Sequence, residues 1–125
     1  MSPRQVPATQ AELSRIGLLA ELPGEQLVAL AKRMRREEVP GGEAPIVEGE
    51  PGDRFYVVLN GMFAVSNFGT MPRRILRSGD YFGEVALAMD VPRTANVRAL
   101  TTAIVASCDK ETFDEFLRPL FADDS

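Results

Sequence analysis

The chain has 125 residues, with 18 acidic and 14 basic side chains, and its composition excludes several classes of function. Because it contains no histidine, the usual serine or cysteine triads and histidine-based metal sites are excluded. Its single cysteine, Cys108, cannot form an internal disulfide or a CxxC metal site. The formal charge of −4 argues against a broad nucleic-acid surface, and no apolar run is long enough for a membrane span. We therefore expect one soluble cytoplasmic domain that is not an enzyme and binds neither metal nor nucleic acid.

The first third of the chain has the pattern of helices. Residues 1–8 contain two prolines and no apolar periodicity, so we expect a loose leader there. A capping-box pattern begins at Thr9, and apolar residues follow at helical spacing, with a break at Pro23. We predict helices over residues 9–36, within a single domain that covers 9–125.

From residue 39 to 109 the chain consists of short β-branched and aromatic runs separated by turn residues. The pair Pro51-Gly52 predicts a type II turn, and Asn60-Gly61 predicts a type I′ hairpin. Glycines recur every 8 to 10 residues, which is typical of a β-roll or sandwich, at Gly42, Gly52, Gly61, Gly69 and Gly79. The predicted strands cover residues 44–47, 55–59, 62–66, 73–76, 96–99 and 103–108.

The end of the chain predicts one more helix, over residues 110–120. Apolar residues at helical spacing support it, and Pro119 disturbs it. Period-two alternation in the preceding strand places Cys108 on an apolar face, so we expect a small core residue rather than a nucleophile. The predicted fold is mainly β with flanking helices.

The segment 81–99 interrupts the strand pattern, and we expect the functional site here. Gly83 begins a short helical stretch, and helix N-termini present unpaired N–H groups and a partial positive charge to an anion. Small residues at Gly83 and Ala86 would let a ligand approach the backbone closely. Arg93 could fold back over the same end of the helix, where its planar guanidinium suits a phosphate. Glu84 would then accept hydrogen bonds from a hydroxyl-bearing part of the ligand, and a phosphate next to a hydroxyl describes a nucleotide's ribose.

The same segment resembles the phosphate-binding cassette of the cyclic nucleotide-binding domain family. This family includes the bacterial cyclic AMP receptor protein, regulatory subunits of cyclic-nucleotide-dependent kinases, and cyclic-nucleotide-gated channels. The resemblance covers roughly residues 12 to 117 and implies a double-stranded β-helix, or jelly-roll-like β-roll, with N-terminal helices, a short cassette helix over 84–89 and a short C-terminal helix. It rests on Phe82-Gly83-Glu84, Pro92-Arg93-Thr94-Ala95 and Val97-Arg98-Ala99, with further matches at 49–53 and 55–61.

The resemblance implies a non-catalytic sensor that binds cyclic AMP or cyclic GMP without a further cofactor. Backbone amides at the start of the cassette helix would hold the cyclic phosphate, Arg93 would neutralise it, and Glu84 would bind the ribose 2′-hydroxyl. Thr94 matches a position whose hydroxyl meets guanine in members that favour cyclic GMP, although the hydroxyl can also help to hold the phosphate. The implied site is Gly83, Glu84, Val85, Ala86, Arg93 and Thr94, with Val65 and Leu76 along the wall near the base.

The chain departs from the family pattern at its end. Members usually continue into a longer helix that covers the base, but only nine residues follow Phe116 here. We expect an output domain outside this chain, or a partner subunit, to supply that lid. Simpler interpretations stand beside these roles: Glu84 only favours a helix N-terminus, Arg93 pairs with Asp90 at the surface, and Thr94 only suits a strand. The strand arginines Arg73, Arg74 and Arg77 either steer an anion toward the site or, as is more common, solvate an exposed strand. For the whole domain, the alternative is a degenerate β-roll that binds other proteins and no nucleotide.

Overall fold

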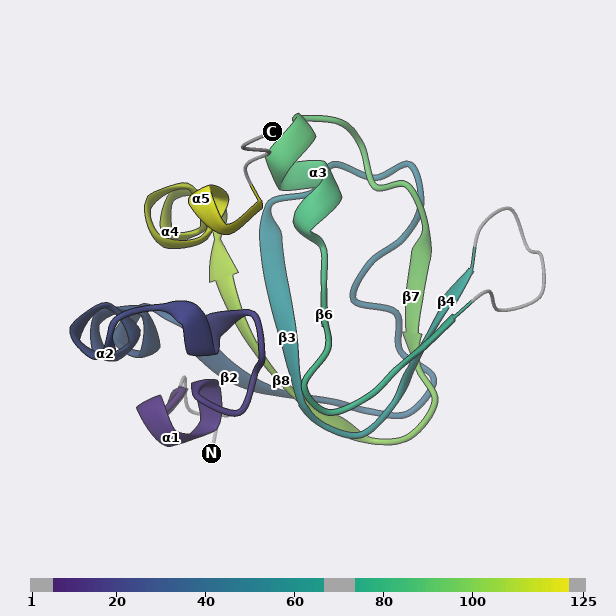
Figure 1. The fold of residues 1–125 in the computed structure, drawn as a ribbon. Helices are drawn as coiled ribbons and strands as arrows, with labels where there is room; N and C mark the ends of the chain where they lie inside the picture. The colour runs from purple at the N-terminus through teal and green to yellow at the C-terminus, as the bar shows by residue number, and fades with distance from the viewer. Residues whose placement is uncertain (1–5, 67–73, 122–125) are drawn as a thin grey trace.

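The computed structural model describes residues 6–66 and 74–121, and two antiparallel sheets form its framework. Figure 1 shows the helices near both chain ends on one side of the larger sheet and the smaller sheet on the other side. The larger sheet has the order β1 (Val6–Pro7), β2 (Arg35–Val39), β8 (Ala103–Asp109), β3 (Arg54–Asn60) and β6 (Tyr81–Phe82). The smaller sheet has the order β5 (Arg74–Leu76), β4 (Phe63–Ser66) and β7 (Asn96–Ala99). The predicted β-roll with flanking helices is therefore confirmed.

The helices are short and lie mainly at the two ends of the chain. The predicted capping box is present, because the Thr9 hydroxyl accepts from the Glu12 amide at 3.1 Å and the Glu12 carboxylate accepts from the Thr9 amide at 3.1 Å. The helical elements are α1 (Gln10–Leu13), a 3₁₀ turn (Leu19–Glu21), α2 (Gly24–Arg33), α3 (Glu84–Met89), α4 (Lys110–Thr112), a π turn (Phe113–Leu117) and α5 (Arg118–Phe121). None of the helices in the described residues is long and apolar enough to cross a membrane.

Alternation along the strands gives the larger sheet two apolar faces and the molecule two cores. The outer face packs against the helices, with Phe55 and Cys108 fully buried there. The inner face packs against the smaller sheet, with Val58 and Phe63 fully buried between the two sheets. Burial raises the pKa of the Cys108 thiol to about 12, so the thiolate is scarce at neutral pH. The prediction that Cys108 is a core residue is confirmed.

The start of the chain differs from the prediction. Within the expected loose leader, Val6 and Pro7 form β1 and pair with β2, and the Ala8 amide donates to the Met34 carbonyl at 3.1 Å. The helices expected over 9–36 are present, but the last of them, α2, ends at Arg33, because the polar residues that follow form β2 and pair with β8 instead. Those polar residues gave no apolar strand pattern, and a distant partner decides their conformation.

Several smaller predictions also differ. The expected strand over 44–47 is a single bridge between Ile46 and Val97, while β6 has too few residues to give a pattern. Both turn types were wrong, because neither Gly52 nor Asn60 has the positive φ that those turns require. Residues 1–5, Gly69 and Arg73 lie outside the described residues.

The C-terminal helix is present but contains a π turn. Its predicted span of 110–120 is covered by α4, the π turn and α5. Pro119 has no amide hydrogen to donate to the carbonyl four residues earlier, and its ring clashes with that carbonyl, so the helix widens before it.

Candidate functional site

A pocket of about 480 Å³ lies between α3 and the smaller sheet. It contains all eight residues that the sequence predicted for the site, from the start of α3, the segment after it, and strands β4 and β5. The lining residues are Ile46, Val65, Arg74, Leu76, Tyr81, Phe82, Gly83, Glu84, Val85, Ala86, Arg93, Thr94, Ala95 and Val97.

Gly83 begins α3 in a conformation that other residues rarely adopt. Its φ is +93°, in the left-handed region, and it occupies the N-cap position. A Cβ atom here would lie 2.9 Å from the Arg54 carbonyl oxygen and 3.3 Å from Arg93 Nη1. Glycine is therefore required at this position for two reasons. It adopts the left-handed conformation, and it leaves space for the Arg54 carbonyl and the Arg93 guanidinium. The first amides of α3 have no acceptor within the helix and lie at the pocket.

Arg93 is the charged centre of the pocket, with a relative exposure of only 7%. Its Nη1 donates to the Gly83 carbonyl at 3.0 Å, and its Nη2 donates to the Arg54 carbonyl at 2.8 Å. Burial lowers the pKa of Arg93 from its ordinary value, and the charges of Tyr56, Asp53 and Glu84 oppose this shift. The side chain is buried among main-chain carbonyls and is not a surface group beside Asp90. A desolvated cation is therefore available to an anion in this pocket.

The loop before β3 holds Arg93 from the other side. The Arg93 amide donates to the Glu50 carbonyl at 2.8 Å, and the Arg93 carbonyl accepts from the Gly49 amide at 2.8 Å. A Cβ atom at Gly52 would lie 2.6 Å from Arg93 Nε and 2.6 Å from the Ala86 Cβ. The sequence assigned Gly52 to a type II turn, but the structure shows that close packing against the guanidinium is what requires a glycine.

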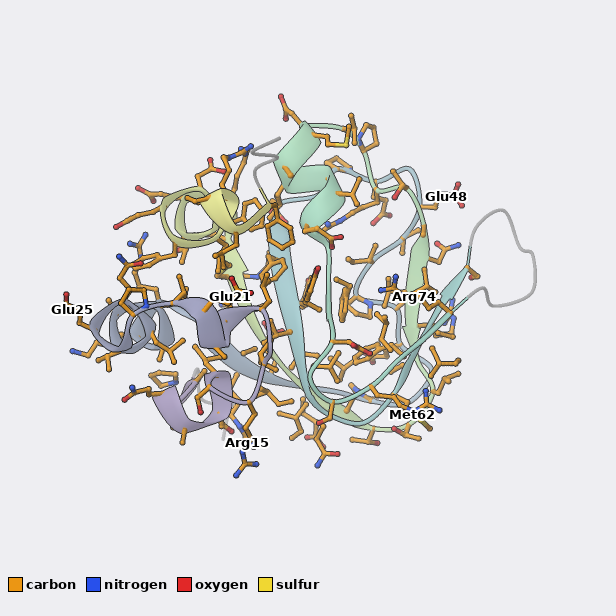
Figure 2. The ribbon with its side chains drawn as sticks, in the orientation of Figure 1. Arg15, Glu21, Glu25, Glu48, Met62 and Arg74 are labelled. Atoms are coloured by element: carbon orange, nitrogen blue, oxygen red, sulfur yellow. The ribbon has the colours of Figure 1, made fainter. Side chains whose placement is uncertain are left out.

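The remaining predicted residues define the rest of the wall. Glu84 is half-buried in the first turn of α3, and Thr94 is exposed at the pocket. Val65 pairs with Arg74 across β4 and β5, which brings Arg74 into the lining as well (Figure 2). Leu76 is buried in the same sheet. From the sequence, Arg74 was expected either to steer an anion or to solvate a strand, and not to line the pocket, because the register of these two short strands could not be read from their composition.

The geometry agrees with the comparison to known families. Residues 36–119 match the family model of the cyclic nucleotide-binding domain, and the chain belongs to this family. The regulatory subunits of cAMP-dependent protein kinase from Debaryomyces hansenii and Yarrowia lipolytica are both 39% identical to it, over 107 and 109 residues. Each match covers 86% of this chain, which spans only 24% and 29% of those two proteins. The chain is thus similar to one part of a regulatory subunit, and the expectation of a non-catalytic domain is confirmed.

Solved structures give the same result. The regulatory domain of Toxoplasma gondii PKA with cAMP superimposes with a TM-score of 0.83 at 29% identity, covering 89% of this chain and 44% of that one. The regulatory subunit of a cAMP-independent protein kinase A from Trypanosoma cruzi, bound to guanosine, superimposes with a TM-score of 0.80 at 26% identity, covering 88% and 40%. Neighbours of this fold therefore include one with a cyclic nucleotide and one with a guanine nucleoside.

The close packing at Gly52 generates a first prediction. Gly52→Ala should lower the free energy of unfolding by about 1–3 kcal/mol, because the new methyl group overlaps Arg93 and Ala86. Urea denaturation measures this change. Gly24→Ala is the matched control, since nothing lies within 4 Å of a Cβ atom there. Equal stability of the two variants would show that the loop has room to move away.

Proposed function

We propose that this domain binds a 3′,5′-cyclic nucleotide, cyclic AMP or cyclic GMP, through the residues that line the pocket. The observation that carries the proposal is the buried guanidinium of Arg93, which two main-chain carbonyls hold at the start of α3. Burial of a cation costs several kcal/mol unless it is paired, and an anionic ligand would supply the missing counter-charge. Family membership and relatives with a bound nucleotide support this ligand class.

The cyclic phosphate would lie between Arg93 and the first turn of α3. The backbone amides of Gly83, Val85 and Ala86 would donate to its oxygens, and Arg93 would neutralise its charge. Glu84, in the same turn, would accept a hydrogen bond from the ribose 2′-hydroxyl. The base would then lie along β4 and β5. This arrangement meets one negative charge with one cation, which suits a mononucleotide better than a polyanion.

The domain would act as the sensor of a larger regulatory protein. Its relatives are kinase regulatory subunits, so we propose a kinase catalytic subunit as the partner that responds to the ligand. The helix that covers the base would come from outside this stretch of chain or from a second copy. A cytoplasmic location follows from that role. The ligand would shift an existing equilibrium of the flanking helices by its difference in affinity for the two states.

Arg93→Ala tests the phosphate contact. Loss of the buried partner of the phosphate should weaken binding by about 2–5 kcal/mol. Isothermal titration calorimetry with both cyclic nucleotides measures the change. Arg98→Ala is the matched control, because Arg98 is exposed and bonds to the Gly42 carbonyl away from the pocket. A wild-type domain that binds neither nucleotide would favour the alternative of a β-roll that binds only proteins, and unchanged affinity of the Arg93 variant would reject the assigned phosphate site.

Glu84→Ala tests the sugar contact. The wild-type domain should bind a cyclic nucleotide more tightly than its 2′-deoxy analogue, because only the former offers the hydroxyl to Glu84. The variant should bind both about equally, with a loss for the normal ligand of about 1.5–3 kcal/mol, as for a hydrogen bond to a charged group. Competition titrations give the ratio of affinities. Glu111→Ala, on the exposed side of the C-terminal helix, is the control, and discrimination that survives in Glu84→Ala would remove its role at the ribose.

Thr94 and Arg74 test the base preference. Guanine presents the acceptors O6 and N7, which suit an arginine fork, whereas adenine presents a donor at N6. If the base meets both side chains, Thr94→Val and Arg74→Ala should each reduce affinity for cyclic GMP by about 0.5–3 kcal/mol more than for cyclic AMP. Parallel titrations with the two ligands measure the difference. Equal losses for Thr94→Val would assign its hydroxyl to the phosphate.

A further inference from the structure

The C-terminal end of α3 is bonded to an arginine from the last helix of the chain. Arg118 Nη1 donates to the Ala88 carbonyl at 3.0 Å, and Nη2 donates to the Leu87 carbonyl at 2.9 Å. Figure 1 shows the C-terminal helices beside α3. No sequence pattern had indicated this contact, because Arg118 lies about 30 residues further along the chain.

The two carbonyls need a donor from outside the helix. An α-helix leaves its last carbonyls without an intrahelical partner, and α3 has only six residues. The chain turns away at Asp90, whose φ of 55° is left-handed, and the Val91 amide donates back to Ala86 at 3.3 Å. The backbone amide that follows the helix therefore bonds to Ala86, and the carbonyls of Leu87 and Ala88 accept from Arg118 instead. A guanidinium suits this position because it donates two parallel hydrogen bonds and places a cation at the negative end of the helix.

Arg118 is itself fixed in direction. Its Nε and Nη2 donate to Asp114 at 2.9 and 2.7 Å, and its guanidinium carbon lies 5.8 Å from the centre of the Phe113 ring. Lys110 donates to the other oxygen of Asp114 at 3.1 Å. The same guanidinium therefore bonds to α3 on one side and to its own helix on the other.

The two ends of α3 have different roles. Its first turn lines the ligand pocket, where Gly83 bonds to Arg93, and its last turn bonds to Arg118. Between these ends, Ala86 and Leu87 are buried. A helix this short moves as a unit, so a contact that holds its last turn also restricts where its first amides can point.

We propose that Arg118 is a positioning residue that fastens α3 to the C-terminal helix and thereby sets the affinity of the pocket. The proposal rests on the proposed function, because affinity for a cyclic nucleotide is the property it controls. Thermodynamic coupling is reciprocal, so ligand bound at the first turn of α3 stabilises the helix that carries Arg118.

The test compares Arg118→Ala with Arg33→Ala. Both arginines contact the C-terminal helix, but Arg33 reaches it from α2, pairing with Glu115 at 2.6 Å and lying over Phe116. Cyclic AMP and cyclic GMP are titrated by calorimetry, and release is followed by stopped flow. We expect Arg118→Ala to bind roughly tenfold more weakly and release faster, the size of a typical coupling energy, while Arg33→Ala stays within about twofold of the wild type. Arg118→Lys, which keeps the charge but loses the fork, should fall between them.

Hydrogen exchange separates this role from a merely structural one. Ligand should protect the amides of residues 110–121 in the wild type and in Arg33→Ala, but much less in a folded Arg118→Ala, whose melting curve verifies its fold. Wild-type affinity together with full protection in Arg118→Ala would overturn the proposal while the proposed function stands. Failure of the wild type to bind either nucleotide would reject the proposed function itself, and this inference with it.

Discussion

The site depends on one buried cation. Arg93 can lie inside the protein only because two main-chain carbonyls accept from it and because Gly52 and Gly83 leave space around it. These contacts come from two stretches that are far apart in sequence: residues 52–54, where the loop enters β3, and Gly83 at the start of α3. The guanidinium thus joins the two stretches and holds this side of the pocket together.

The β-roll supplies the rigidity that this arrangement needs. The Arg54 carbonyl faces Arg93, while the Arg54 side chain is fixed by Ser107, its Nη2 lying 3.0 Å from the Ser107 hydroxyl. That hydroxyl donates to Glu37 on β2 at 2.6 Å, so the position of the carbonyl depends on three neighbouring strands. Because carbonyls are neutral, they satisfy the hydrogen bonds of Arg93 without cancelling its charge. A carboxylate in their place would have competed with an anionic ligand.

How much the sequence could predict depends on the range of the forces involved. The helix over 84–89 agrees residue for residue with α3, because Gly83 and the apolar run after it mark its two limits in the local sequence. All eight predicted site residues line one pocket, because the family resemblance assigned them by position: six lie in the cassette, and Val65 and Leu76 were placed along the wall near the base. Strand β2 was missed, since pairing with β8 determines it. The need for glycine at Gly52 was also misread, because Arg93 approaches it from 41 positions further along the chain and no local pattern records that contact.

The short helix α3 explains how so small a ligand could influence the rest of the domain. A helix of six residues is marginal by itself, so partners at its ends must hold it in place. Arg93 provides one of these contacts through the Gly83 carbonyl, and Arg118 provides another through Leu87 and Ala88. A longer helix would be stabilised by its own hydrogen bonds and would respond less to either end. Because α3 is held at both ends, a phosphate bound at its first turn would also change how firmly its last turn holds the C-terminal helix.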